Sequence, residues 1–111
     1  MIGQKTKYFK KVEKYLAKNK IEKQVQFLEN VSMEELAAIY KLAEIFVYPS
    51  LFEGFGIPVI ESLFSKTAVI TSNLSCLPEA GGEHSMYVNP ENFEDIKSKI
   101  LFLWNNESER N

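Results

Sequence analysis

The 111-residue sequence has little of several residue types on which common protein functions depend. It contains one cysteine, Cys76, and one histidine, His84, so it cannot form an internal disulfide and has too few soft ligands for a structural zinc site. It has no excess of positive charge, with 13 basic against 15 acidic residues, which argues against nucleic acid as a partner. These shortages exclude disulfide-stapled and zinc-finger domains and disfavour nucleic-acid-binding ones.

A long apolar run is also missing. The longest uncharged stretch, 67–78, is interrupted by serine, asparagine and proline, and the first residues, MIGQKTKYFKK, have no apolar centre like that of a signal peptide. We therefore expect no transmembrane segment and a cytoplasmic location. Peripheral attachment at the inner membrane face remains open.

The composition that is present is that of a small globular domain. Hydrophobic residues make up 45% and charged residues 25% of the chain, which is typical of a folded protein and not of a disordered one. Helical and strand patterns alternate along the sequence, and this alternation predicts an α/β fold with a parallel sheet and covering helices.

Hydrophobic periodicity and capping signals predict the individual elements. Ser32 and Glu35 form a capping-box pattern before the second helix, and Asn92 is the expected cap of the last one. We expect 72–82 to be a loop and the polar residues after Asn105 to be frayed. The predicted helices are 6–19, 33–43, 57 to about 66 and the segment after Asn92, and the predicted strands are 25–29, 45–48, 67–71 and 86–88.

Burial can be predicted for several of these elements. The strand 45–48 is expected to be a buried central strand, His84 to be exposed and Cys76 to be inert packing. The lysines on the first helix are interrupted by Glu13 and Glu22, and we interpret them as a solvated face. Apolar residues expected on buried helix faces are Tyr8, Phe9, Val12, Tyr15 and Leu16 in the first helix and Phe93, Ile96, Ile100, Leu103 and Trp104 in the last.

The segment with the most chemical information is PSLFEGFGIPVIES, residues 49–62, a glycine-containing loop between a predicted strand and a predicted helix. Ligands of open α/β sheets bind at such places. The helix start offers unpaired N–H groups and a positive dipole end, while Gly54 and Gly56 allow a phosphate to approach closely. Glu53 and Glu61 would then reach different parts of one ligand. The alternative is a simple tight turn with both glutamates solvated, and the residues alone leave the two open.

The same loop imitates the beginning of a dinucleotide-binding fingerprint, but the match is weak. Val59 stands where the third glycine belongs. A nicotinamide site also needs an acidic residue near the end of the next strand to hold the ribose, and Thr71, Ser72 and Asn73 stand there instead. The pattern therefore counts against a dehydrogenase.

The stretch VYPSLFEGFGIPVIES closely resembles the E-x7-E signature of retaining, nucleotide-sugar-dependent glycosyltransferases of family 4, with Glu53 and Glu61 as the two carboxylates. The flanking stretches NVSMEELAAIYKLAEIFVYPS, TSNLSCLPEAGG and MYVNPENFEDI resemble the same family. The resemblance covers almost the whole chain. It implies the GT-B architecture, two Rossmann-like domains facing across a cleft, with this chain belonging to the C-terminal, donor-binding domain.

The resemblance also implies roles for individual residues. Glu61 would accept hydrogen bonds from the ribose hydroxyls, and Glu53, the catalytic candidate, would contact hydroxyls of the transferred sugar near the reacting carbon. The backbone amides of 55–57 would hold the sugar and the diphosphate, and Val31 would lie beside the base. No metal and no cofactor beyond the donor are implied. The residues assigned to the donor are thus Val31, Gly54, Phe55, Gly56, Ile57 and Glu61.

The implied reaction is the transfer of a hexose from a nucleotide-diphosphate-sugar to a glycan or lipid-linked acceptor with retention of configuration, as in polysaccharide biosynthesis. An alternative of another class is a non-catalytic Rossmann-like interaction module that docks on a separate chain. Retention of Glu53, Glu61 and the GFGIP sequence favours a donor site, because a purely structural role needs neither carboxylate.

Two departures from the family pattern matter. The family usually has Gly and Pro between the signature helix and the next strand, where this chain has Ser65-Lys66-Thr67-Ala68. The Arg and Lys that clamp the donor diphosphate, the first strand of the donor domain and the acceptor domain all lie upstream of the position matching Met1. We therefore expect residues 1–111 to be a partial donor-binding domain that is inactive alone, with an incomplete sheet open to self-association.

Overall fold

The computed structural model describes residues 1–2, 7–52 and 54–110. The chain forms two compact units, Met1–Glu35 and Leu36–Asn111, and each is described by itself. The first contains α1 (Lys7–Lys18), the short 3-10 helix η1 (Glu22–Gln24) and the start of α2 (Met33–Leu42). The second contains the rest of α2 and then β1 (Ile45–Tyr48), α3 (Ile57–Phe64), β2 (Ala68–Ser72), α4 (Leu77–Gly81), η2 (Gly82–His84), β3 (Met86–Val88), α5 (Phe93–Asn105) and α6 (Glu107–Arg110).

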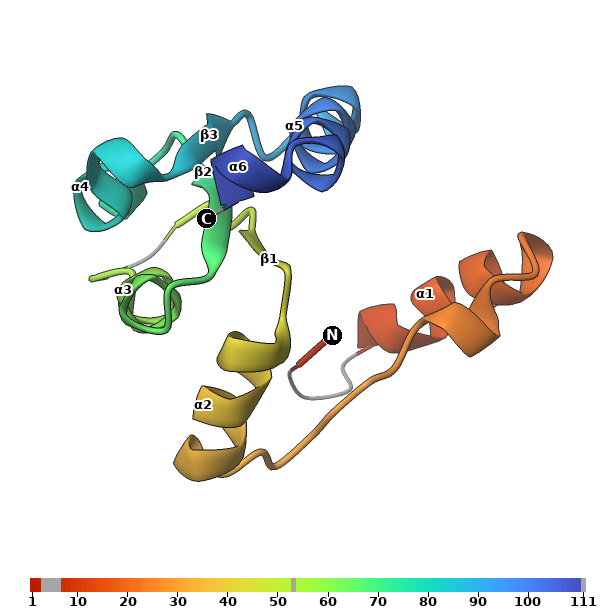
Figure 1. Ribbon diagram of the computed structural model, residues 1–111. Helices are drawn as coiled ribbons and strands as arrows, with labels where there is room; N and C mark the ends of the chain where they lie inside the picture. The colour runs from red at the N-terminus through yellow and green to blue at the C-terminus, as the bar shows by residue number, and fades with distance from the viewer. Residues whose placement is uncertain (3–6, 53, 111) are drawn as a thin grey trace. The chain divides into compact units, whose positions relative to one another are not determined.

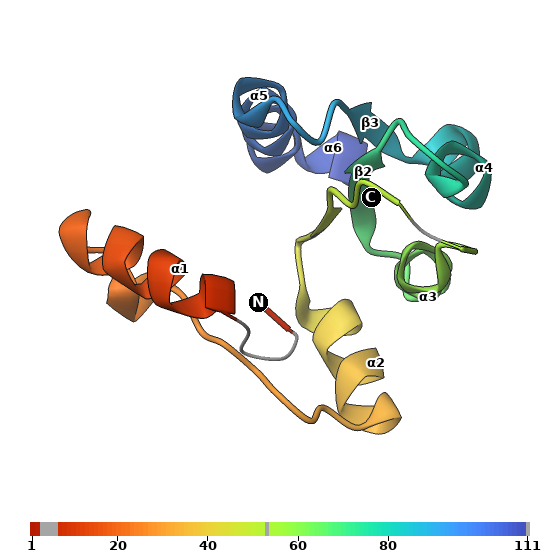
Figure 2. The same ribbon diagram turned by 180° about the vertical axis from the view of Figure 1, so that it is seen from behind.

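The larger unit is built on a parallel sheet in the order β1-β2-β3. Helices α3 and α4 cover one face of this sheet and α5 covers the other (Figures 1 and 2). Because successive strand residues point to opposite faces, β1 and β2 contribute to both cores, while Met86 and Val88 of β3 pack in the core under α5. The fold is therefore the predicted α/β arrangement of a parallel sheet with covering helices. The two cores are centred on Val59, Val69 and Leu77 and on Ile70, Val88 and Leu103.

The prediction of a buried central strand at Ile45–Tyr48 is wrong. Strand β1 pairs with β2 alone in the sheet formed by the described residues, and its side chains are only half-buried. The central strand is β2, whose residues Val69–Ser72 are all buried. A strand is fully buried only when neighbours lie on both of its edges, and β1 has a neighbour on one.

The prediction of a regular strand at 25–29 is also wrong. Among the described residues of the first unit, this segment forms a single isolated parallel bridge, between Ile2 and Leu28. The amide of Leu28 donates to the carbonyl of Met1 at 2.8 Å, and the terminal amine of Met1 donates to the carbonyl of Gln26 at 2.7 Å. A regular strand needs a neighbouring strand of several residues to pair with. Among the described residues, this segment is paired with Met1 and Ile2.

Local signals located most helix starts correctly. The Ser32 hydroxyl accepts a hydrogen bond from the Glu35 amide at 3.1 Å, and the Asn92 side chain accepts from the amides of Glu94 and Asp95, as predicted. Two helices differ from the predictions. Helix α4 forms where the sequence predicts a loop, and α6 forms where it predicts a frayed end. The missed signal for α4 is Pro78, which lies in the first helical turn, where its absent N–H costs nothing.

Four aromatic residues expected on buried helix faces are exposed. In α1 the buried stripe is narrower than predicted and is centred on Leu16, with Phe9 and Val12 half-buried. In α5 the buried stripe runs through Ile96, Ile100 and Leu103, at a spacing that leaves the neighbouring positions facing water. The exposed residues and fractions are Tyr8, 72%, Tyr15, 63%, Phe93, 71%, and Trp104, 60%.

The turn between α3 and β2 is a Schellman motif with a lysine where glycine is favoured. The Lys66 amide donates to Leu63 at 2.9 Å and the Thr67 amide donates to Ser62 at 3.1 Å. Lys66 adopts φ 61°, the left-handed conformation that a side chain destabilises.

We expect Lys66→Gly to raise the free energy of unfolding by about 0.5–1 kcal/mol, because relief of the left-handed strain exceeds the added flexibility of the unfolded chain. Urea denaturation measures the change. Lys97→Gly, inside α5, is the matched control and should lower stability by about 1 kcal/mol. A loss of stability in Lys66→Gly would show that the lysine side chain stabilises the turn.

The remaining expectations about single residues and membrane spans can be compared directly with the structure. His84 is exposed, as predicted, and Cys76 is half-buried and not part of a disulfide. None of the helices in residues 1–2, 7–52 and 54–110 has the length and apolar character needed to cross a bilayer.

Candidate functional site at the start of helix α3

The candidate site lies at the carboxyl edge of the sheet. Strand β1 ends at Tyr48, the segment Pro49–Gly56 follows, and α3 begins at Ile57. In this arrangement the first turn of α3 presents its N–H groups and the positive end of its dipole at the edge where parallel α/β sheets bind ligands. Pro58 lies in the first turn and has no N–H to leave unpaired.

Gly56 fixes the path of the chain into α3. It is buried and caps the helix with φ 69°, a conformation that favours glycine. A Cβ atom there would lie 2.9 Å from the Cβ of Ala80 and 3.2 Å from a methyl carbon of Leu77. The residue is therefore glycine for two reasons, its backbone angle and the close approach of α4.

Glu61 is held by a hydrogen bond from a buried tyrosine. The Tyr40 hydroxyl donates to Oε2 of Glu61 at 3.2 Å, and the ring of Tyr40, 5% exposed, packs edge-on against Phe46 with centroids 5.2 Å apart. The Thr67 hydroxyl donates to the carbonyl of Tyr40 and fixes the end of α2. The carboxylate of Glu61 is thus oriented through its Oε2 atom.

The electrostatics of this pair keep the tyrosine protonated. Burial, followed by the charge of Glu61 and the hydrogen bond to it, raises the pKa of Tyr40 to about 12. A phenol with this pKa remains a hydrogen-bond donor throughout the physiological range. Tyr40 therefore positions Glu61 at any pH at which the fold is normally studied.

The structure brings most of the predicted donor-binding residues together on one loop and one helix. Gly54 and Phe55 precede Gly56, and Ile57 and Glu61 lie on α3. Glu53 lies outside the described residues. Val31 belongs to the first unit, Met1–Glu35, and is half-buried there.

The side chains around the start of α3 are unusually apolar for an exposed surface. Phe52 and Phe55 are 80% and 79% exposed, and Leu51 and Ile57 are more than half exposed. Apolar side chains gathered beside an exposed helix start are typical of a surface covered by a ligand or another domain. Within the described part of the chain, no group of three or more His, Cys, Asp or Glu residues is arranged to hold a metal ion.

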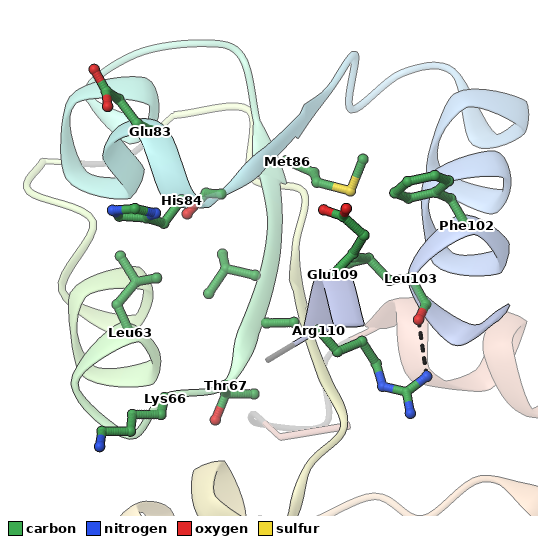
Figure 3. A pocket seen from close by; sticks show the side chains of 13 residues that line it. Leu63, Lys66, Thr67, Glu83, His84, Met86, Phe102, Leu103, Glu109 and Arg110 are labelled. Atoms are coloured by element: carbon green, nitrogen blue, oxygen red, sulfur yellow. Dashed lines mark hydrogen bonds between the residues drawn. The ribbon is translucent and has the colours of Figure 1, made fainter. Parts of the chain in front are cut away.

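A hollow lies at the other end of the strands, away from the candidate site (Figure 3). It has a volume of about 720 Å³ and is lined by residues at the amino ends of β2 and β3. Its inner polar groups already have protein partners: Thr67 donates to Tyr40, and Arg110 donates to the carbonyl of Leu103 at 2.9 Å. Because ligands of parallel α/β sheets bind at the carboxyl ends of the strands, we place the candidate site at α3 and not in this hollow.

Two supports of the site were not found by reasoning from the sequence. Tyr40 lies 21 residues before its partner Glu61, and no local pattern indicates that pairing. Leu77 and Ala80 pack under Gly56 from a helix that was predicted to be loop. The one available signal was the sequence Leu77-Pro78, an apolar residue followed by a proline suited to a first helical turn.

The chain is similar in sequence to known mannosyltransferases. The chain is 36% identical over 96 residues to the O-antigen chain mannosyltransferase RfbU of Salmonella typhimurium, an alignment that covers 86% of this chain and 27% of the relative. It is 36% identical over 77 residues to the O-antigen chain mannosyltransferase B of Escherichia coli, covering 69% of this chain and 20% of the relative. The chain therefore spans between a fifth and about a quarter of the length of these relatives.

A solved structure shows a similar fold. The C-terminal domain of a glycosyl transferase group 1 family protein from Francisella tularensis matches 93% of this chain and 54% of its own length, with a TM-score of 0.79 and 27% identity. The fold is thus that of the C-terminal domain of GT-B glycosyltransferases. Residues 1–111 match the family described as glycosyl transferases group 1, and the chain belongs to that family.

Proposed function

We propose that this chain supplies most of the donor-binding site of a retaining glycosyltransferase that uses a nucleoside diphosphate sugar. The observation that carries the proposal is the start of α3, fixed by Gly56 at the carboxyl edge of the sheet, with Glu61 oriented by Tyr40 on the same helix. A helix start favours a diphosphate through its N–H groups and its dipole. A carboxylate one turn further along favours the hydroxyls of a ribose.

Glu61 would hold the ribose of the nucleotide. The Tyr40 hydroxyl occupies one position on Oε2, and a carboxylate has about four acceptor positions in all. Two neighbouring ribose hydroxyls can therefore donate to Glu61 while the bond from Tyr40 persists. Hydrogen bonds to an ionised carboxylate are stronger than those between neutral groups.

The remaining donor contacts follow the order of the chain. The backbone amides of Phe55, Gly56 and Ile57, with the open backbone at Gly54, would hold the sugar and the diphosphate. Glu53 would contact hydroxyls of the transferred sugar near the reacting carbon, and Val31 would lie beside the base. A helix N-terminus and protein cations would stabilise the leaving diphosphate, so the proposal requires no metal.

The transferred sugar is proposed to be mannose, because the two relatives described above are named mannosyltransferases. The acceptor would be a glycan or a lipid-linked glycan, since both relatives are named for the O-antigen chain. Because the chain spans a fifth to about a quarter of those relatives, we propose that the acceptor site and the basic residues for the diphosphate come from polypeptide outside these 111 residues. The chain alone would then be inactive, in the cytoplasm or at its membrane face.

The edge position of β1 supports a second candidate function. A strand at the edge of a sheet can accept a strand from another chain. The alternative is therefore a non-catalytic Rossmann-like module that docks on a separate chain or on a second copy through β1. It predicts association without nucleotide binding.

The experiment that tests the catalytic proposal is Glu53→Ala in the full-length enzyme that contains this chain. Transfer of mannose from its nucleoside diphosphate donor should fall at least about tenfold more than the affinity for the free nucleoside diphosphate, because the lost contacts are to the sugar at the reacting carbon. Glu107→Ala, on the exposed helix α6, is the control. Equal losses in transfer and binding would show that Glu53 only shapes the loop, and a product of inverted anomeric configuration would overturn the retaining mechanism.

A further inference from the structure

Positive charge is concentrated in one short segment of this acidic chain. Residues 5–23 contain eight of the 13 basic residues and only two of the 15 acidic ones. The rest of the chain has five basic residues against 13 acidic ones. The segment therefore has a net charge of +6 in a chain whose total is −2, and α1 forms most of it.

The charges on α1 are arranged as a stripe. Lys7, Lys11, Lys14 and Lys18 follow one another at intervals of four, three and four residues, so they share one face of the helix. Leu16 lies on the opposite face and is buried. No acidic residue of α1 lies within the stripe, because its one glutamate is on another side of the helix. At about 1.5 Å per residue the stripe is roughly 17 Å long.

Two exposed aromatic residues flank this lysine stripe. Tyr8 and Tyr15 are 72% and 63% exposed, and their spacing of seven residues places both on the same side of the stripe. The ammonium group of Lys11 lies over the Tyr8 ring, 5.1 Å from its centroid. The opposite side of the helix is fixed within its own unit, where Phe9 packs edge-on against Phe27 with centroids 4.8 Å apart.

We propose that the lysine stripe of α1, with Tyr8 and Tyr15, docks on an anionic lipid surface. A straight row of ammonium groups on a convex helix fits a flat sheet of negative headgroups, and each lysine near such a surface raises the affinity about fivefold. Tyrosine side chains are enriched at the headgroup level of membranes. The inference does not depend on the proposed donor site.

Two other occupants fit these observations less well. Sequence-specific recognition of nucleic acid favours arginine for its bidentate contacts to phosphates and bases, and lysine is the only basic residue type in the segment 5–23. A second copy of this chain would offer acidic residues, but these are dispersed from Glu29 to Glu109 and do not form a run comparable to the stripe.

The test measures binding of the full chain to sedimented vesicles at low salt. The wild-type chain should bind vesicles of phosphatidylcholine and phosphatidylglycerol at least about tenfold more tightly than vesicles of phosphatidylcholine alone. The variant with Lys7, Lys11, Lys14 and Lys18 all replaced by glutamine should lose at least about tenfold of that affinity. Glutamine is used because its helix propensity is close to that of lysine.

A matched control separates the stripe from net charge. The variant with Lys41, Lys66, Lys97 and Lys99 replaced by glutamine has the same net charge as the stripe variant but keeps the lysine stripe. It should bind anionic vesicles as tightly as the wild-type chain does. Equal losses in the two variants, or equal binding to neutral and anionic vesicles, would overturn the proposal. So would a duplex DNA that binds the stripe more tightly than the vesicles do, or a dimer without lipid that the stripe variant abolishes.

Salt dependence keeps the test decisive if the stripe variant loses helix content by circular dichroism. Binding of the wild-type chain to anionic vesicles should fall steeply as salt is raised, because the attraction is electrostatic and exposed. Binding that does not respond to salt would overturn the proposal without use of the variant.

Discussion

Substitution of Gly56 by alanine is expected to lower the free energy of unfolding by about 2–5 kcal/mol. The left-handed backbone at φ 69° costs a side chain about 1–2 kcal/mol. The added Cβ would lie 2.9 Å from the Cβ of Ala80, and overpacking of this kind costs about 1–3 kcal/mol. Urea denaturation measures the total.

Two other glycines separate the contributions. Gly82 has φ 62° and ψ −152°, a region essentially restricted to glycine, and a Cβ there meets no described atom within 4 Å, so Gly82→Ala should show backbone strain alone, about 1–3 kcal/mol. Gly54→Ala meets no described atom within 4 Å either and has no positive φ, so it should change stability little. If Gly56→Ala costs no more than the left-handed strain alone, about 1–2 kcal/mol, the close packing of α4 under the candidate site is wrong.

Substitution of Glu61 by alanine is expected to weaken nucleoside diphosphate binding at least about tenfold. The reason is the loss of charged hydrogen bonds to the ribose, worth about 1.5–3 kcal/mol. Glu61→Gln keeps an acceptor for Tyr40 and should lose less affinity than Glu61→Ala. Glu107→Ala is the control for the change in net charge, and unchanged affinity in Glu61→Ala would remove the ribose role.

A second measurement on Glu61→Ala does not depend on any ligand. The pKa of Tyr40, raised to about 12, should fall part of the way towards 10, because the charge and hydrogen bond of Glu61 are removed while the burial remains. Absorbance titration of the phenols measures this change. A pKa that does not move would mean that the pair does not form in solution.

The fold class could be predicted from the sequence because its signals are local. Alternating patterns gave a parallel α/β sheet, and the side chains of Ser32 and Asn92 marked helix starts that the structure confirms. The wrong predictions concern properties that depend on neighbours. The sequence predicts β1 in the middle of the sheet, but β1 lies at its edge. It also predicts Trp104 in the core, but Trp104 lies at the surface, where the guanidinium carbon of Arg110 is 5.9 Å from its ring centroid.

The candidate site was predictable in part for the same reason. The loop and helix that contain Gly54, Gly56 and Glu61 are one continuous segment, so the sequence alone places them together. The support of Glu61 by Tyr40 and of Gly56 by Ala80 joins elements that are distant in the chain. Such pairings depend on how α2 and α4 pack on the sheet, which no local pattern specifies.

The most direct test of the donor site is calorimetric titration of the 111-residue chain with UDP, GDP and ADP, with light scattering of the same sample. The account predicts saturable binding of one nucleotide, which would also identify the base that the site prefers. The affinity for that nucleotide should fall at least about tenfold in Glu61→Ala. A folded chain that binds none of the three nucleotides would contradict the account and would favour an interaction module that associates through β1.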